Sequence, residues 1–351
     1  MKVLKFGGTS VKNAENILKT IQIVRKSLEK SQVVVVVSAF GGITNKLIEA
    51  GTKAKTGDSS YNELITEITT IHHEAIDLLL KGDRISKNKM YVDTLMQNLQ
   101  NILHGISLIK ELSIRSLDII SSYGERLSAH IIADAMCEQG ITASYLDART
   151  VIKTDKTFGA AKVNFEKTDA NIRECFAKAS STLVATGFIA STDDDETITL
   201  GRGGSDYSAA IFAHALDVEI LEIWTDVDGM MTADPRKVKK AYPITHVSYA
   251  EAMELSHFGA KVLEPRTVIP AMAKGIPVII KNTFNPDALG TYISKENQNP
   301  EHRVQGISSI DEISLITVQG SGMIGEAGIS MRLFKAIAKE QINVILITQG
   351  S

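Results

Sequence analysis

Apolar residues recur along the start of the chain with two different spacings, which predict strands alternating with helices. Residues 2–6 are apolar apart from one lysine and end at two glycines. An amphipathic helix is predicted after Asn13, because apolar residues recur at intervals of four, three and four at Ile17, Ile21, Val24 and Leu28. The five consecutive valines at 33–37 are typical of a parallel strand buried on both faces. This order predicts a βαβ unit in a parallel sheet.

The same kind of pattern continues to about residue 290. Two apolar stripes predict helices between about 60 and 110, and His72 and His73, which lack metal-ligand spacing, are predicted to be surface or boundary residues. Further helices are predicted from Gly124 and from Asp206 through Ala215. Strands are predicted at 117–122, 183–190, 197–200, 218–224 and 277–281. The resulting α/β fold would bind ligands at the carboxyl edge of its sheet.

A cluster of acidic residues separates two of these strands. Residues 193–196 read Asp-Asp-Asp-Glu, and we expect them to form the solvated tip of a hairpin, the alternative being a metal site.

The composition changes near residue 290, which predicts a domain boundary. We expect a domain over 1–292, a polar linker over 293–306 and a second segment over 307–351. Strands at 313–318 and 343–348 and a helix at about 325–340 make that segment β-α-β. A piece of about 45 residues buries too little surface to fold alone. We therefore expect it to pack on the main domain or a partner chain, or to begin a longer domain.

Overall composition narrows the class of protein. The 351 residues are 44% hydrophobic and 23% charged, and their net charge of −3 favours neither nucleic acid nor anionic membrane. The two cysteines, Cys137 and Cys175, do not suggest a disulfide framework. No signal peptide opens the sequence, and no apolar run approaches the roughly 20 residues that cross a bilayer. We expect a cytoplasmic protein.

Glycine-rich turns supply the first candidate chemistry. Residues 5–10, 38–42 and 201–206 each combine glycines with polar residues after a predicted strand. Glycine lets backbone N–H groups approach an anion, and a helix beginning there adds a positive end. A phosphate site is therefore predicted. The sequence has no G-x-x-x-x-G-K-[ST] loop, and no G-x-G-x-x-G opens the first βα unit, so P-loop and dinucleotide folds are disfavoured.

Charged residues beside these turns are the candidate binding groups. Lys5 interrupts an apolar strand, and Lys261 follows Gly259 and Ala260, so either could neutralise phosphate or simply reach solvent. Arg202, between glycines, can grip a carboxylate or phosphate with two parallel bonds. Asp206 and Glu125 could be ligands or only favourable carboxylates at a helix start. Spacing alone leaves Asp226 and Asp228 as turn formers or as groups that orient a nucleotide or magnesium.

Four motifs in the first 263 residues together resemble one family. They are Lys5-Phe6-Gly7-Gly8-Thr9-Ser10, Gly201-Arg202-Gly203-Gly204-Ser205-Asp206-Tyr207, Trp224-Thr225-Asp226-Val227-Asp228-Gly229 and Phe258-Gly259-Ala260-Lys261-Val262-Leu263. In this order they resemble the motifs of aspartate kinases. The stretches at 104–108 and 345–349 are similar to the kinase half of bifunctional aspartokinase/homoserine dehydrogenases, in which regulatory ACT domains and a dehydrogenase follow. The chain therefore looks like a truncated N-terminal portion that ends within an ACT domain.

The resemblance implies a fold and a reaction. The fold would be the amino-acid kinase fold, a three-layer αβα sandwich with a mainly parallel open sheet, followed by a partial ACT-like β-α-β segment. The reaction would be phosphoryl transfer from MgATP to the side-chain carboxylate of L-aspartate, the first step of lysine, threonine and methionine biosynthesis. No general base is needed, because a carboxylate of pKa about 3.9 is already ionised near pH 7.

The resemblance also implies residue roles. The catalytic residues would be Lys5, Lys261 and Asp206. Aspartate would be held by Ser38, Thr44, Glu125, Arg202 and Ser205. ATP would contact Lys5, Gly7, Gly8, Thr9, Thr225, Asp226, Met231, Arg236, Lys261 and Val262. No protein metal site is predicted, and Mg²⁺ would come with ATP.

Two positions depart from the family pattern, and other functions remain open. Glu264 stands where the family usually has histidine, and Met231 stands where tyrosine is common. The alternatives are another amino-acid kinase, acting on acetylglutamate, glutamate, carbamate or a nucleoside monophosphate, or a regulatory fragment without turnover. A homo-oligomer, dimer or tetramer, is expected from the family. Binding of threonine or lysine is expected to need regulatory residues beyond this sequence.

Overall fold

The computed structural model of the chain describes residues 1–257, 263–296, 304–311, 313–320, 327–340 and 342–348. They belong to two units, Met1–Ser309 and Ile310–Ser351. No helix among these residues is both long and apolar enough to cross a membrane.

An eight-stranded sheet forms the centre of the first unit. Its order is β3-β5-β2-β1-β8-β10-β11-β9, and every pair of neighbours is parallel except β10 and β11. The strands are β1 (Lys2–Phe6), β2 (Val33–Val37), β3 (Ala143–Leu146), β5 (Thr182–Thr186), β8 (Ile220–Thr225), β9 (His246–Ser248), β10 (Val278–Asn282) and β11 (Thr291–Ser294). A separate small sheet contains β4 (Lys153–Thr154), β6 (Ile189–Thr192) and β7 (Thr197–Thr199).

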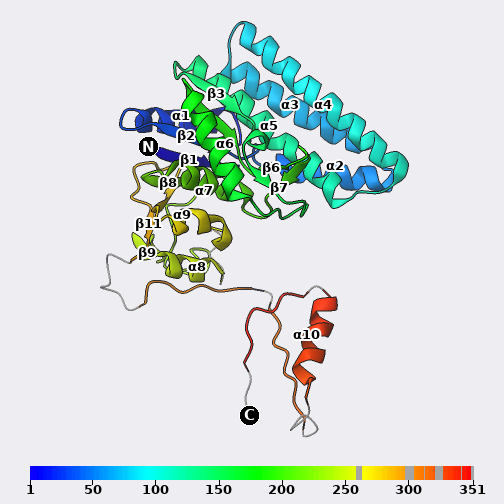
Figure 1. The fold of residues 1–351 in the computed structure, drawn as a ribbon, viewed down its shortest axis with the longest axis vertical. Helices are drawn as coiled ribbons and strands as arrows, with labels where there is room; N and C mark the ends of the chain where they lie inside the picture. Colours follow the sequence, from blue (N-terminus) through cyan, green and yellow to red (C-terminus); the bar gives the residue numbers. More distant parts are fainter. Residues whose placement is uncertain (258–262, 297–303, 312, 321–326, 341, 349–351) are drawn as a thin grey trace. The chain divides into compact units, whose positions relative to one another are not determined.

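Helices cover both faces of the large sheet, which gives the predicted three layers. One apolar core joins alternate strand residues to α1 (Ala14–Leu28), α2 (Ile43–Thr56), α3 (Tyr61–Leu79), α4 (Asp83–Ile109) and α5 (Ile114–Glu138). The other joins the opposite strand residues to α6 (Phe165–Lys178), α7 (Gly204–Leu216), α8 (Tyr249–His257) and α9 (Ile269–Ala273). Figure 1 shows α2–α5 grouped together, apart from α8 and α9.

Strand alternation decides where the unusual lysine of β1 points. Leu4 and Phe6 are buried in the first core, whereas Val3 is buried in the second. Successive side chains point to opposite faces of a sheet, so Lys5 lies on the side of Val3, which is the side of α7. The β1–α1–β2 prediction is confirmed: all five valines of β2 are buried, and Asn13 caps α1 by accepting a hydrogen bond from the Asn16 amide.

Two predicted strands are wrong in detail. Residues 117–122, predicted as a strand, belong to α5, so Glu125 lies inside this helix rather than at its start. The apolar stretch 183–190 is two strands, because Gly187 and Phe188 interrupt it and Phe188 adopts a φ of 67°. That left-handed conformation turns the chain from the large sheet into the small one.

The prediction that His72 is a surface or boundary residue is wrong. Its side chain is fully buried in α3, where its ring stacks on Phe40 with 4.7 Å between centroids. Its Nδ1 lies 2.7 Å from the carbonyl oxygen of Ile68, and burial lowers the pKa of the imidazole to about 4. His72 is therefore a neutral core residue.

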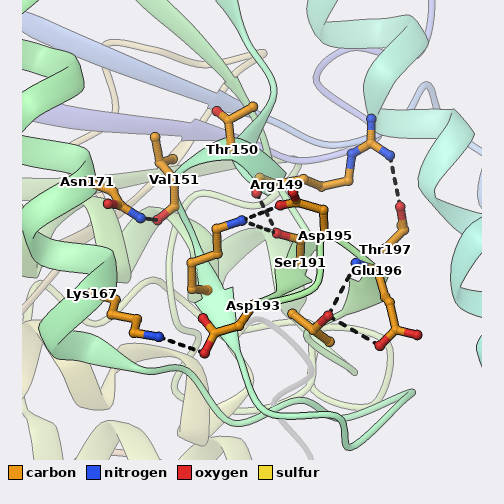
Figure 2. Close-up of polar contacts among 12 residues, drawn as sticks. Arg149, Thr150, Val151, Lys167, Asn171, Ser191, Asp193, Asp195, Glu196 and Thr197 are labelled. Atoms are coloured by element: carbon orange, nitrogen blue, oxygen red, sulfur yellow. Dashed lines mark hydrogen bonds and ion pairs between the residues drawn. The ribbon is translucent and has the colours of Figure 1, made fainter.

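The acidic tip predicted between β6 and β7 is confirmed as an exposed hairpin. Figure 2 shows Lys167 directed at Asp193 and a lysine amine directed at Asp195. The Nζ atoms of Lys167 and Lys153 lie 2.7 Å from the carboxylates of Asp193 and Asp195, and Lys156 lies 2.6 Å from Asp194. Each of these carboxylates has a basic partner, and no group of three metal-ligating residues occurs within the part of the chain that the structure describes.

The second unit contains the predicted helix but not the predicted strands. Helix α10 (Ile329–Lys339) is present and buries none of its residues. Residues 313–318 and 343–348 are not strands, which contradicts the β-α-β prediction. A strand requires a ladder of hydrogen bonds to a partner strand, and the described residues of this unit supply no such ladder.

Candidate active site

A cavity of about 470 Å³ lies where β1 and β2 end and α7 begins. It is lined by residues from five parts of the fold: the ends of strands, the start of α2, the first turn of α7, one face of α5, and two glycine turns. Seven of the residues that the sequence singled out line it together, namely Lys5, Ser38, Thr44, Glu125, Arg202, Ser205 and Asp206. The cavity thus lies at the carboxyl edge of the sheet, where the sequence predicts a ligand site.

Lys5 and Asp206 form an ion pair in this cavity. The Lys5 ammonium contacts Oδ1 of Asp206, and the two side chains are only 10% and 12% exposed. Asp206 lies in the first turn of α7, where the helix dipole also favours a carboxylate. Lys5 is therefore not a residue that reaches out to bulk solvent, and its amine is held at the cavity wall.

Two serines connect the end of β2 to the start of α7. The Ser38 hydroxyl donates to the hydroxyl oxygen of Ser205 at 2.7 Å, and Ser128 of α5 donates to the Ser38 carbonyl at 2.7 Å. Ser205 is able to approach because residue 187 is glycine: a Cβ there would lie 2.7 Å from the Ser205 Cβ. This contact places both hydroxyls in the cavity wall.

Arg202 is presented on a tight turn between two glycines. Gly201 and Gly203 adopt φ values of 79° and 68°, which favour glycine. Arg202 is exposed and lines the cavity mouth. Within the described residues its guanidinium makes no hydrogen bond or ion pair, so its donors are available to an anion.

Glu125 is a buried carboxyl group with one oxygen unsatisfied. Gly124 allows α5 to approach the loop after β2, because a Cβ there would lie 2.7 Å from the Ala39 Cβ. The Ala39 amide then donates to Glu125 Oε1 at 3.1 Å, while Oε2 is buried without a partner among the described residues. Burial raises the pKa of Glu125 to about 8. A ligand ammonium would satisfy this oxygen and restore its charge.

Other cavity residues were not predicted. Asp118 and Ser121 lie on the same face of α5 as Glu125, while Phe188 and Gly159 contribute from loops and Thr199 from the end of β7. Reading 117–122 as a strand hid this face. As a helix, residues 118, 121 and 125 recur at intervals of three and four, which places polar side chains on one stripe.

Apart from Lys5, the predicted nucleotide residues that the structure describes lie beside the cavity rather than in its lining. The Gly7 amide donates to the Trp224 carbonyl at 3.1 Å, so the glycine turn after β1 lies against the end of β8, where Thr225 and Asp226 follow. Gly8 lies against the loop after β2, since a Cβ there would be 3.2 Å from the Ala39 carbonyl oxygen. The N–H of Gly7 is therefore hydrogen-bonded within the protein, so a contact of this residue with a phosphate would use another of its atoms.

The other described residues of this set also lie outside the cavity lining. Thr9 and Asp226 are exposed, and Met231 is partly buried in a β-bridge with Pro243. The exposed Arg236 donates hydrogen bonds to both carboxylate oxygens of Asp234, from Nε at 3.0 Å and from Nη2 at 2.7 Å among others, which lowers the pKa of that carboxyl to about 2. Lys261 and Val262 lie outside the described residues.

Two family models match the chain, one within each of its two units. The amino acid kinase family matches residues 1–282, and an ACT domain matches residues 316–351. The chain belongs to the amino acid kinase family.

Similar proteins narrow this family to the aspartokinases. The crystal structure of E. coli aspartokinase III in complex with aspartate and ADP has a TM-score of 0.84 and 30% identity, over 100% of this chain and 76% of that one. A bifunctional aspartokinase/homoserine dehydrogenase of Buchnera aphidicola is 34% identical over 100% of this chain and 43% of its own length. One from Zea mays is 35% identical over 99% of this chain and 38% of its own length. The chain thus spans about two fifths of these two relatives.

Proposed function

We propose that this chain catalyses phosphoryl transfer from MgATP to the side-chain carboxylate of L-aspartate, giving ADP and 4-phospho-L-aspartate. One observation carries the proposal: Arg202 and Glu125 line the same cavity as the Lys5–Asp206 pair. A guanidinium and a buried carboxyl complement the carboxylate and ammonium of an amino acid. The Lys5 ammonium complements a transferred phosphoryl group. The complex of E. coli aspartokinase III with aspartate and ADP supports this choice of substrates.

The chemistry requires little from the protein besides position and charge. An oxygen of the aspartate side chain attacks the γ-phosphorus, the bond from that phosphorus to the β–γ bridging oxygen breaks, and ADP leaves with the electron pair. No proton moves, because the attacking carboxylate is already ionised near pH 7, with an unperturbed pKa of about 3.9. Lys5 would neutralise the equatorial oxygens of the phosphoryl group, and Asp206 would hold its amine in place.

The nucleotide would lie along the ends of β1 and β8. The turn at Gly7 and Gly8 and the residues Thr225 and Asp226 stand at this edge. Mg²⁺ usually takes one or two carboxylates together with substrate phosphates, and Asp226 is an exposed carboxylate directly after β8. We assign it that contact, and the ion would offset the charge of the phosphates.

ADP formation with a panel of acceptors tests the proposal. We expect turnover with MgATP and L-aspartate, and an acyl phosphate that hydroxylamine traps as the hydroxamate. Glutamate, N-acetylglutamate, carbamate and a nucleoside monophosphate should give at most a few per cent of that rate. Turnover confined to one of these other acceptors would overturn the assignment.

Effector binding by this chain alone is proposed to be weak. An E. coli aspartokinase III structure contains lysine as well as aspartate. Here α10 buries no residue and the described part of the second unit forms no sheet, so it offers no enclosed effector site. Calorimetry with lysine or threonine should give no micromolar binding, and a micromolar isotherm would contradict this.

A further inference from the structure

Asp118 is a buried carboxylate in the cavity wall whose two oxygens hold two different loops. It is 3% exposed and lies on α5, about two helical turns before Glu125. Its Oδ1 accepts a hydrogen bond from the Thr199 hydroxyl at 2.6 Å. Its Oδ2 accepts one from the Gly159 amide at 2.8 Å. With both oxygens engaged in this way, Asp118 acts on the loops rather than directly on a ligand.

The two loops contact each other next to Arg202. Thr199 ends β7, and its carbonyl accepts a hydrogen bond from the Ala161 amide at 3.3 Å. Gly201 follows at a φ of 79°, and a Cβ there would lie 3.2 Å from the Gly159 carbonyl oxygen. The loop that carries Gly159 therefore supports one side of the turn that presents Arg202.

The other side of that turn is supported independently. At Gly203 a Cβ would lie 2.7 Å from the Thr267 methyl group and 2.8 Å from the Glu264 Cβ. The backbone of Arg202 is thus held between two close approaches. Only the side at Gly201 depends on Asp118, so loss of this carboxylate would loosen the turn without unfolding α7.

We propose that Asp118 is a positioning residue that orients the Arg202 turn through Thr199 and Gly159, and so sets the affinity for the carboxylate of the acceptor amino acid. This rests on the function proposed above. A carboxylate suits the task because it accepts on both oxygens, whereas an amide would turn its NH₂ group towards one of the two donors. An arginine must hold its planar fork in one orientation to bind a carboxylate with two bonds.

Steady-state kinetics of Asp118→Asn in the full chain tests this proposal. One buried donor would lose its acceptor, and we expect the KM for aspartate to rise on the order of tenfold. The KM for MgATP should remain within twofold of the wild type. Thr199→Val should also raise the KM for aspartate. Thr199→Ser keeps the hydroxyl and should have the wild-type KM.

Glu222→Gln provides a matched control for the loss of a buried carboxylate. Glu222 is 6% exposed, accepts from Trp224 Nε1 at 3.0 Å, pairs with Lys2 at 2.9 Å and lies outside the cavity lining. We expect this variant to lower the melting temperature without changing the KM for aspartate. If Asp118→Asn behaves like Glu222→Gln, or raises both KM values equally, Asp118 is only structural and the inference is wrong.

The experiment separates this inference from the proposed function. Failure of the proposed function appears as absence of aspartate-dependent ADP formation in the wild type. Failure of the inference appears as normal wild-type turnover together with an unchanged KM for aspartate in Asp118→Asn.

Discussion

The Lys5 ammonium and the Asp206 carboxylate form an ion pair that joins the carboxyl end of β1 to the first turn of α7. Both side chains are nearly buried. Lys5 can act in two ways: its charge stabilises the fold by pairing with Asp206, and it is proposed to neutralise the phosphoryl group during catalysis. The change Asp206→Asn separates the two, because it removes the partner charge. A cation that contributes only to stability would be dispensable once its partner is neutral.

Lys5→Met is expected to abolish turnover and to destabilise the protein. It leaves a nearly buried carboxylate without its cation, which costs about 3 kcal/mol. It also removes the charge proposed to stabilise the phosphoryl group, which should lower kcat at least a hundredfold, roughly as for other transition-state donors. Adding Asp206→Asn should recover most of the melting temperature and none of the activity. A double variant that regains activity would show that Lys5 is structural only.

Arg202→Lys is expected to weaken aspartate binding without affecting folding. Lysine is a point charge and loses the two parallel bonds of the guanidinium, so the KM for aspartate should rise by roughly ten- to a hundredfold. The melting temperature should not change, because Arg202 is exposed. Arg84→Lys, at a surface pair with Glu138 of 2.9 Å, is the control and should leave both quantities unchanged. If Arg202→Lys and Arg84→Lys have equal effects on the KM for aspartate, Arg202 does not bind the substrate.

The sequence was sufficient to predict the five central strands of the large sheet, but not its edge strands β3, β9 and β11 and not every helix. The valines of β2 can only be a strand buried on both sides, and the stripe after Asn13 is long enough to show helical spacing. Residues 117–122 were too few to distinguish the two spacings, and they belong to a helix of 25 residues. The strands predicted at 313–318 and 343–348 failed because a strand needs a partner that local pattern does not reveal.

The candidate site could be predicted only where chemistry sits beside a glycine turn. Lys5, Arg202 and Asp206 stand out because a charge adjoins glycines at a strand end. Asp118 does not, because its partners Gly159 and Thr199 are 41 and 81 residues away. The buried state of Glu125 was hidden for the same reason: it depends on the approach of α5 to Ala39, 86 residues away.

The acidic hairpin is expected to be inert towards metals. Asp193 and Asp194 are 57% and 65% exposed and pair with lysines, an arrangement that contributes little to stability. Asp193→Asn/Asp194→Asn should therefore leave the urea midpoint of unfolding within error of the wild type. Addition of millimolar Ca²⁺ or Mg²⁺ in the absence of nucleotide should not shift either midpoint. A shift in the wild type that the double variant lacks would establish a metal site at this tip.

Glu125 is expected to make both stability and substrate affinity depend on pH. Its folded pKa of about 8 exceeds the ordinary value of 4.5, so the folded protein holds one more proton than the unfolded chain between these values. Its contribution to the free energy of unfolding is therefore complete below pH 4.5 and falls by about 1.4 kcal/mol per pH unit as the pH rises towards 8. Glu125→Gln keeps the acceptor for the Ala39 amide and cannot ionise. Measured by urea unfolding between pH 5 and 9, the free energy of unfolding of this variant should change less with pH than that of the wild type. The variant should be stabilised most, relative to the wild type, at about pH 8.

Ionisation of Glu125 should strengthen aspartate binding, whereas it lowers the stability of the fold. The substrate ammonium pairs with the ionised carboxylate, so in the wild type the KM for aspartate should fall as the pH rises from 6 to 8. At pH 7 aspartate binding should also release a proton, which calorimetry in two buffers of different ionisation enthalpy would detect. In Glu125→Gln the KM should be high and flat with pH, and no proton should be released. A wild-type KM that is constant between pH 6 and 8 would contradict the assignment of Glu125 to the substrate ammonium.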